Sequence, residues 1–262
     1  MKEAAGPAHS GVIFDLDGTL VDSEPFWFRG FSTGLSRILE VRGYGLHYLD
    51  PSEMRGFAGG RVPDTIAAIL RSLRLEGRID DSETDAIVQD VLNYVTEQFV
   101  TDPAPIPEAV STARALHADS VPMAIASSSA PSFIEAVLDV LKLQDTFPVR
   151  VSAVDLPRGK PDPAVYLLAL QQMGLPARRT VAVEDSRVGV AAAMNAKMRC
   201  LWYLPGETGS LAERTDLTSQ LEGQATNPSD ILRLVTVTGH LSHGLLAEML
   251  DETATEGAAD EL

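Results

Sequence analysis

Short apolar segments alternate with longer segments rich in helix-forming residues along most of this chain. The apolar segments have the length and composition of buried β-strands and lie at residues 12–14, 121–126, 149–153, 180–183 and 200–203. Helix-forming segments separate the later strands and lie at residues 131–143, 162–173 and 188–196. Strands that alternate with helices indicate βαβ units. We therefore predict an α/β fold built on a parallel sheet that is flanked by helices.

The stretch from residue 22 to residue 103 interrupts this alternation, because it contains helical segments and no convincing strand. We predict helices over residues 25–40, 63–75 and 82–99. Ser82 and Asp85 have the spacing of an N-terminal capping pair at the start of the last one. A connection of this length between the first two strands is too long for a crossover loop. An inserted α-helical domain is the economical interpretation.

The chain therefore divides into three predicted parts. These are a sheet domain over residues 1–21 and 104–205, a helical domain over residues 22–103, and a C-terminal extension over residues 206–262. In the extension the pattern weakens: residues 206–210 are typical of a loop, and residues 252–262 are expected to be frayed or disordered. We expect the extension to pack partly on the sheet domain and to end in a flexible acidic segment.

Two carboxylates follow the first predicted strand. Asp15 and Asp17 lie on the same side of an extended chain, because side chains alternate with period two. Two acids at a strand end are costly unless a cation holds them, and that end is where open α/β sheets bind ligands. A calcium loop is excluded, because Gly18 is fourth rather than sixth and Phe26 occupies the twelfth position. A metal and phosphate site and a solvated turn both remain open for these residues alone.

Three further polar groups follow later strands. Ser127 comes after the second strand, Lys160 after the third, and Glu184-Asp185 after the fourth. Each has an ordinary explanation alone, since such residues also cap helices or occupy solvated turns. Because the carboxyl ends of parallel strands meet at one sheet edge, we expect all of these side chains to converge with the first two acids.

The chemistry of such a cluster suits Mg²⁺, which takes oxygen ligands and keeps waters and a phosphate oxygen. Asp15 and Asp185 are the expected carboxylate ligands, with the backbone carbonyl of Asp17 as a third and Glu184 as a direct or water-mediated one. Lys160 and Ser127 are then placed to neutralise a transferring phosphoryl group, whose reaction depends on positioning and charge stabilisation.

The amino-acid composition limits the kinds of partner and the cellular location that we expect. The 262 residues have a formal net charge of −16, which argues against a nucleic-acid partner because such partners need a basic surface. The single cysteine, Cys200, excludes an internal disulfide and lies in an apolar stretch, where buried packing is expected. No signal-peptide core and no membrane-spanning apolar run is present. We expect a cytoplasmic monomer or weak dimer that acts on a small phosphorylated metabolite, with no membrane partner.

The residues at the strand ends resemble a known family. Asp-Leu-Asp-Gly-Thr at residues 15–19, Ser127, Gly-Lys-Pro-Asp-Pro at residues 159–163 and Glu-Asp-Ser-x-x-Gly at residues 184–189 are similar, in order, to the four motifs of the haloacid dehalogenase-like hydrolase superfamily. The resemblance implies a Rossmann-like core, a helical cap domain inserted after the first motif, and a Mg²⁺-dependent enzyme that forms an aspartyl-phosphate.

The same resemblance implies roles for individual residues. Asp15 is the nucleophile, and Asp17 protonates the leaving oxygen and then activates the water that cleaves the aspartyl-phosphate. An Asp at position 17 also favours phosphoryl transfer over dehalogenation, because the dehalogenases that this chain resembles use no second catalytic Asp there.

Two subgroups of this family share the helical cap. Members similar to β-phosphoglucomutase have a His where this chain has Trp27, whereas residues 22–27 resemble phosphatases of sugar and polyol phosphates such as hexitol phosphates or 2-deoxyglucose-6-phosphate. We therefore favour hydrolysis and keep a phosphosugar mutase as the alternative. A non-catalytic binding protein on this fold is the alternative from a different class.

Substrate contacts are expected from the cap and from the loop after the second strand. Arg61 corresponds to a basic residue that related caps direct at the active site, although a solvated arginine before a helix is equally consistent. Glu24 and Trp27 are candidate lid residues, and Trp27 has an equal claim to packing between cap and core. Ser128 completes the predicted substrate-binding set.

Overall fold

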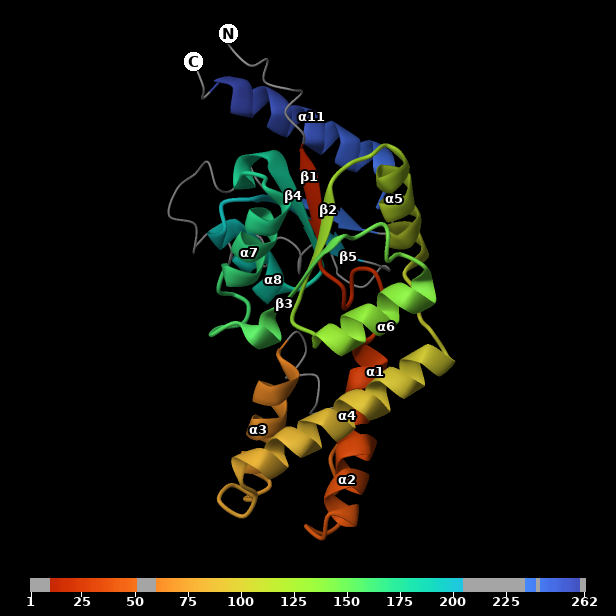
Figure 1. The fold of residues 1–262 in the computed structure, drawn as a ribbon, viewed down its shortest axis with the longest axis vertical. Coiled ribbons are helices and arrows are strands. Elements are labelled where there is room, and N and C mark those ends of the chain that lie inside the picture. Colours follow the sequence, from red (N-terminus) through yellow and green to blue (C-terminus); the bar gives the residue numbers. More distant parts are fainter. Residues whose placement is uncertain (1–9, 51–59, 205–233, 239–240, 260–262) are drawn as a thin grey trace.

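A computed structural model describes residues 10–50, 60–204, 234–238 and 241–259 of the chain (Figure 1). Its centre is a sheet of six parallel strands in the order β3-β2-β1-β4-β5-β6. The strands are β1 (Gly11–Phe14), β2 (Met123–Ser127), β3 (Val149–Ser152), β4 (Thr180–Glu184), β5 (Arg199–Leu204) and β6 (Leu234–Thr238). The predicted α/β fold with a parallel sheet is confirmed.

The central strand β1 is buried along its whole length and pairs with β2 on one side and β4 on the other. Such burial on both faces is typical of parallel sheets and explains the continuous apolar run in the sequence. The carboxyl ends of β1, β2 and β4 therefore lie next to one another. Any polar residue that directly follows these strands is brought to the same edge.

Helices cover both faces of the sheet. Val12 and Phe14 belong to the same core cluster as residues of α5 (Pro107–Ala118), α6 (Pro131–Leu141) and α11 (His243–Ala259). Ile13 points to the opposite face, where it joins residues of α7 (Ala164–Met173) and α8 (Arg187–Asn195). The two clusters follow from the alternation of side chains along β1. Cys200 is buried in the second cluster, as its apolar neighbourhood predicts.

The C-terminal region is more ordered than its sequence pattern predicts. Strand β6 extends the sheet beside β5, and α11 contacts α5 and β4. The segment from residue 252, which is expected to be frayed or disordered, is helical in the structure as far as Ala259, where α11 ends. The loop expected at residues 206–210 lies outside the described residues. None of the helices in the described part of the chain is long and apolar enough to cross a lipid bilayer.

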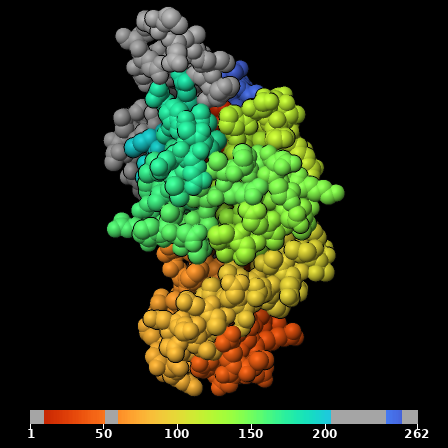
Figure 2. Space-filling model, viewed as in Figure 1, coloured from red at the N-terminus to blue at the C-terminus, as the bar shows by residue number. Residues whose placement is uncertain are grey.

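Between β1 and β2 the chain forms a layer of helices at the carboxyl edge of the sheet (Figures 1 and 2). Its members are α1 (Glu24–Arg29), the π-helical turn η1 (Gly30–Gly34), α2 (Leu35–Val41), α3 (Val62–Ser72) and α4 (Asp81–Thr101). We call this set the helical layer. In the space-filling view its orange and yellow surface lies directly against the green surface of the sheet domain.

Two local features of this layer differ from the prediction. The single helix expected over residues 25–40 is interrupted by η1, whose two end glycines lie against α4. A Cβ at Gly30 would lie 2.3 Å from the Val95 side chain, so the close approach of the helices requires glycine there. The N-cap of α4 is Asp80, which accepts a 2.8 Å hydrogen bond from the backbone N–H of Glu83, and not Ser82.

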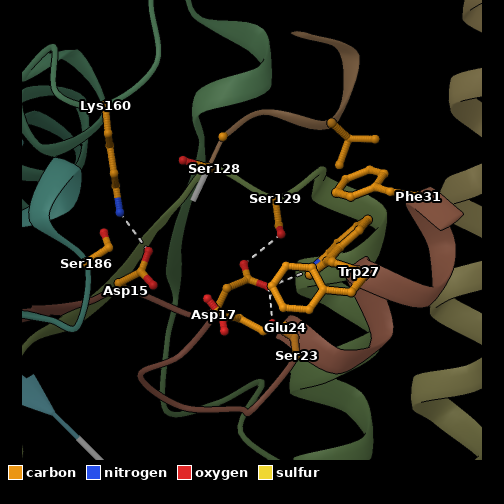
Figure 3. Close-up of a pocket in the computed structure, with 13 residues that line it drawn as sticks. Asp15, Asp17, Ser23, Glu24, Trp27, Phe31, Ser128, Ser129, Lys160 and Ser186 are labelled. Atoms are coloured by element: carbon orange, nitrogen blue, oxygen red, sulfur yellow. Dashed lines mark hydrogen bonds and ion pairs between the residues drawn. The ribbon is translucent and has the colours of Figure 1, made fainter. Parts of the chain in front are cut away.

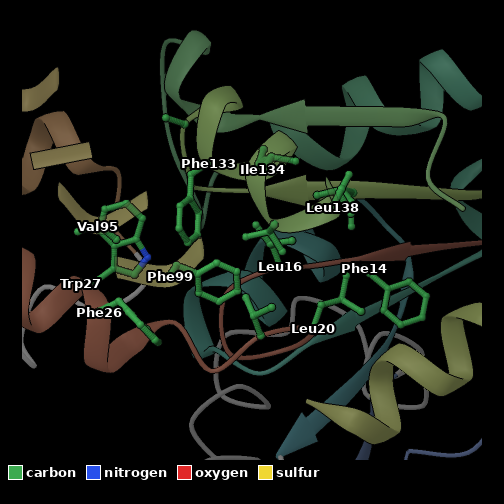
Figure 4. Close-up of a cluster of buried hydrophobic side chains, with 14 of the residues drawn as sticks. Phe14, Leu16, Leu20, Phe26, Trp27, Val95, Phe99, Phe133, Ile134 and Leu138 are labelled. Carbon is green, nitrogen blue, oxygen red and sulfur yellow. The ribbon is translucent and has the colours of Figure 1, made fainter. Parts of the chain in front are cut away.

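A chain of aromatic side chains joins the helical layer to the sheet domain (Figure 4). Phe99 of α4 contacts Phe26 of α1 and Phe133 of α6 edge to face, with ring centroids 5.5 and 5.6 Å apart. Trp27 also contacts Phe133, at a centroid distance of 5.0 Å. Because Phe133 lies in the first turn of α6, which packs on the sheet, these rings fix α1 and α4 relative to the strand ends.

We expect Phe99→Ala to lower the free energy of unfolding by about 3–5 kcal/mol, because it removes a fully buried ring at the centre of this contact. Urea titration followed by circular dichroism measures the change. The adjacent Val100→Ala, at a side chain that is 47% exposed, is the matched control and should change stability by less than about 1 kcal/mol. Equal losses in the two variants would contradict the packing role of Phe99.

Candidate active site

A pocket opens at the carboxyl edge of the sheet, between the strand ends and the helical layer (Figure 3). Its described lining comes from both parts of the fold and consists of Asp15, Asp17, Ser23, Glu24, Trp27, Phe28, Phe31, Gly60, Val62, Ser128, Ser129, Lys160 and Ser186. The sheet domain supplies Asp15, Asp17, Lys160 and three of the serines, whereas α1 supplies Glu24 and, with η1 and the start of α3, most of the apolar wall. The position agrees with the rule that open α/β sheets bind ligands beyond their strand ends.

Lys160 pairs with two carboxylates inside this edge. Its Nζ lies 2.6 Å from Asp15 Oδ1 and 2.5 Å from Glu184 Oε1, and it donates a third hydrogen bond to the carbonyl of Ala126 at 3.0 Å. All three charged side chains are at least 93% buried. Burial alone would lower the pKa of Lys160, but the two carboxylates outweigh it and raise the pKa, so the amine stays charged.

Glu184 is held by four hydrogen bonds. Its Oε1 accepts from Lys160 and from the Tyr166 hydroxyl at 2.8 Å, and its Oε2 accepts from the backbone N–H and hydroxyl of Ser186 at 3.2 and 3.1 Å. A Cβ at Gly189 would lie 1.8 Å from Oε1. The Glu-Asp-Ser-x-x-Gly motif is thereby explained. Glu184 ends β4, Ser186 caps α8, and Gly189 leaves room for the carboxylate.

Asp15, Glu184 and Asp185 each place one carboxylate oxygen within 4.8 Å of the other two. Burial raises the pKa of Asp15 to about 8; Lys160 opposes that rise, and Glu184 and Asp17 add to it. Burial and the neighbouring acids also raise the pKa of Asp185 well above its usual range. Lys160 therefore does not offset all the charge of the group.

This donor set fits a hard divalent cation. The clustered ligands are carboxylate oxygens, and a dipositive ion would stabilise their charged forms against the burial and, to a lesser extent, the neighbouring acids that raise the pKa values of Asp15 and Asp185. The backbone makes room for Asp185: Gly18 has a positive φ of 81°, and a Cβ there would lie 2.0 Å from Asp185 Oδ2. The glycine of the first motif thus has two physical reasons, its conformation and this close approach.

Asp17 is surrounded by hydrogen-bond donors. Its Oδ1 accepts from the Ser23 hydroxyl at 2.5 Å and from the Trp27 indole N–H at 2.9 Å. Its Oδ2 accepts from the Ser127 and Ser129 hydroxyls at 3.1 and 2.6 Å. Ser23, just before the helical layer, and Trp27, in its first helix, thus hold Oδ1. Ser127 and Ser129, at the end of β2, hold Oδ2. This carboxylate has a fixed orientation beside Asp15 in the pocket (Figure 3).

Most of the predicted site residues meet at this edge, but Ser127 and Arg61 are placed differently from what we expect. Ser127 is fully buried and turns its hydroxyl to Asp17 and to the backbone N–H of Ser129, while Ser128 lines the pocket. Arg61 precedes α3 and reaches toward the sheet domain. Its guanidinium donates to the carbonyl of Leu156 at 2.7 Å and pairs with Asp64 at 2.6 Å. It is not among the described lining residues of the pocket.

Sequence reasoning missed several residues of the site. Ser23 and Ser129 were not singled out, although both follow closely after the acids or a strand end, which is the one signal that could have found them. The apolar wall of Phe28, Phe31 and Val62 had no sequence signal that separates it from ordinary core packing. Trp27, a candidate lid or packing residue, lines the pocket and packs against Phe31 and Phe133.

Comparison with known proteins agrees with the motifs. A family model described as haloacid dehalogenase-like hydrolase matches residues 9–197, so the chain belongs to this family, as its motifs indicate. It is 30% identical over 191 residues to a phosphoglycolate phosphatase of Pseudomonas fluorescens, covering 72% of this chain and 67% of that protein. It is also 30% identical to the fructose-1-phosphate phosphatase of Escherichia coli, covering 72% and 94% of the two chains.

Among solved structures, a β-phosphoglucomutase from Clostridium difficile superposes with a TM-score of 0.71 over 96% of this chain and 99% of that chain. The identity between the two is 16%, so the match shows a shared fold.

We expect Gly189→Ala to destabilise the protein by about 1–3 kcal/mol, because the new methyl group would collide with the buried Glu184 carboxylate. Displacement of Glu184 would also free Lys160 from one of its two acidic partners. Denaturant titration measures the loss. Gly244→Ala is the matched control, since no atom lies within 4 Å of a Cβ at that helical glycine. Equal stability of the two variants would refute the steric requirement.

Proposed function

We propose that this protein is a Mg²⁺-dependent phosphatase that hydrolyses a small sugar or polyol phosphate through an aspartyl-phosphate on Asp15. One observation carries the proposal. Asp15 and Asp17 face the same pocket beyond the strand ends. Asp15, the candidate nucleophile, is buried and paired with Lys160, and hydrogen bonds fix the orientation of Asp17. The names of the related phosphatases support the substrate class, because one acts on fructose 1-phosphate.

The reaction assigns one task to each residue. A carboxylate oxygen of Asp15 attacks phosphorus, the bond from phosphorus to the ester oxygen breaks, and Asp17 gives its proton to the departing alcohol. Asp17 then takes a proton from water as that water attacks the aspartyl-phosphate, which releases phosphate and restores Asp15. Lys160 keeps positive charge beside the attacking carboxylate throughout.

Asp15 and Asp185 are the carboxylates that would hold the magnesium ion, with the backbone carbonyl of Asp17 as a further ligand. Both oxygens of Glu184 already accept hydrogen bonds from protein groups, which favours a contact through water for that residue. When bound, the ion supplies positive charge that offsets the charge of the acids and of the phosphoryl group. Ser128 and Glu24, both in the pocket lining, are the proposed substrate contacts.

Arg61 remains a proposed substrate residue that would first have to leave its present partners. Its guanidinium bridges the start of α3 and the turn η3 (Ala153–Asp155) with the residue that follows it. For that reason we consider Arg61 a weaker candidate for substrate contact than Ser128 and Glu24.

The nucleophile assignment predicts that Asp15→Asn abolishes phosphate release from p-nitrophenyl phosphate in the presence of MgCl₂, a loss of roughly 10³-fold or more. An amide cannot form the aspartyl-phosphate. The exposed Asp145→Asn is the control and should keep wild-type turnover. An inactive wild type, or an Asp15→Asn variant that is as active as the wild type, would overturn the proposal.

A phosphosugar mutase is the second candidate, because a β-phosphoglucomutase has this fold. Trp27 weighs against it: the indole N–H can donate a hydrogen bond but cannot accept a proton, unlike the histidine that the mutase resemblance leads one to expect. Conversion of β-glucose 1-phosphate to glucose 6-phosphate without release of phosphate would establish the mutase instead.

The division of labour between the two motif acids predicts that Asp17→Asn keeps Mg²⁺ binding while its turnover falls by roughly 10²-fold or more. Its expected metal contact is a main-chain carbonyl, which the substitution retains. Isothermal titration with MgCl₂ measures binding, and Asp185→Asn is the matched variant that should lose it. Loss of Mg²⁺ binding in Asp17→Asn would contradict this assignment.

A further inference from the structure

Trp27 makes a polar contact that its role in packing does not require. Its indole Nε1–H donates to Asp17 Oδ1 at 2.9 Å, from a helix that belongs to the helical layer and not to the sheet domain (Figure 3). We infer that Trp27 is a positioning residue that holds the Asp17 carboxyl group in the orientation needed to protonate the leaving oxygen. This role rests on the proposed function and adds to it a residue from outside the four motifs.

The chemistry of the four donors around Asp17 separates Trp27 from the others. The three serines carry hydroxyl groups, which can donate to the carboxylate and can rotate to accept when the carboxyl group holds a proton. Indole only donates. Trp27 therefore supplies Oδ1 with a donor that cannot reverse its direction, so this contact restricts the rotation of the carboxyl group in a way that a rotating hydroxyl does not.

The indole ring is itself fixed. It is 8% exposed, stacks on Phe31 at a centroid distance of 5.8 Å and an angle of 25°, and meets Phe133 edge to face. Phe133 belongs to the sheet domain and Phe31 to the helical layer, so the ring is held from both sides. A donor with so little freedom can restrict the carboxylate that it binds, because its own orientation costs no further ordering.

A positioning role for proton delivery has a consequence that a purely structural role lacks. An alkyl alkoxide is a poor leaving group and needs the proton from Asp17, whereas p-nitrophenolate leaves without one. The ratio kcat/KM covers the steps up to cleavage of the ester bond, before hydrolysis of the aspartyl-phosphate. Loss of the indole contact should therefore depend on the leaving group when the two esters are compared by kcat/KM.

The experiment measures kcat/KM of Trp27→Phe for fructose 1-phosphate and for p-nitrophenyl phosphate on the same preparation. We expect a loss of about 30- to 100-fold for the sugar phosphate and of less than about 3-fold for the aryl ester, in line with the effect of misplacing a catalytic group. Because both values come from one sample, their ratio does not depend on the fraction of folded enzyme. A variant of reduced stability thus still tests the inference.

Two further variants separate the hydrogen bond from packing. Phe133→Leu removes an aromatic neighbour of Trp27 but keeps the indole N–H, so any loss should be the same for both esters. Trp27→Gln restores an N–H donor that does not titrate, and should return the ratio of the two kcat/KM values toward that of the wild type. A ratio in Trp27→Gln that stays at the Trp27→Phe value would count against the hydrogen bond.

The outcomes distinguish this inference from the proposed function. Equal losses for the two esters in Trp27→Phe, or no loss for either, would overturn the positioning role and leave the phosphatase assignment intact. A wild-type protein that releases phosphate from neither ester would overturn the proposed function itself.

Discussion

The buried ammonium group of Lys160 is the interaction on which the rest of the site depends. It lies among acids that the ends of β1 and β4 bring to one sheet edge, and its contacts with Asp15 and Glu184 are both shorter than 2.7 Å. Removing such a partner from a buried ion pair leaves an uncompensated charge, which costs more than the pair itself contributes. The carboxylates that Lys160 does not neutralise form a cluster that fits a divalent cation.

The backbone around this charge cluster is arranged so that the acids can approach one another. Gly18 and Gly189 occupy positions where a single methyl group would overlap Asp185 and Glu184. Ser186 and Tyr166 then hold Glu184 by hydrogen bonds. The motif spacings thus reflect steric and hydrogen-bond requirements around the acids, and not the acids alone.

The helical layer supplies part of the pocket lining and packs against the sheet domain. Trp27 contacts Phe133 in the aromatic cluster that joins α1 and α4 to α6, and the same side chain lines the pocket and donates a hydrogen bond to Asp17. Packing and chemistry therefore share residues here. Trp27 is the clearest case, since one face of its ring stacks on Phe31 while its N–H reaches a carboxylate.

The sequence alone specifies the order in which strands and helices follow one another, the parallel sheet and the polar residues at the strand ends. Buried strands need continuous apolar runs, and the carboxyl ends of parallel strands share one edge of the sheet. Only the tertiary structure decided the contacts that link distant segments. The need for glycine at position 30 depends on the close approach of Val95, and the orientation of Asp17 depends on Trp27 and on the serines at the end of β2. Likewise β6 and α11 are stabilised by neighbours in the sheet domain that no local pattern encodes. Periodicity reports which residues are buried, but close approach and hydrogen-bond geometry arise only when separate elements pack together.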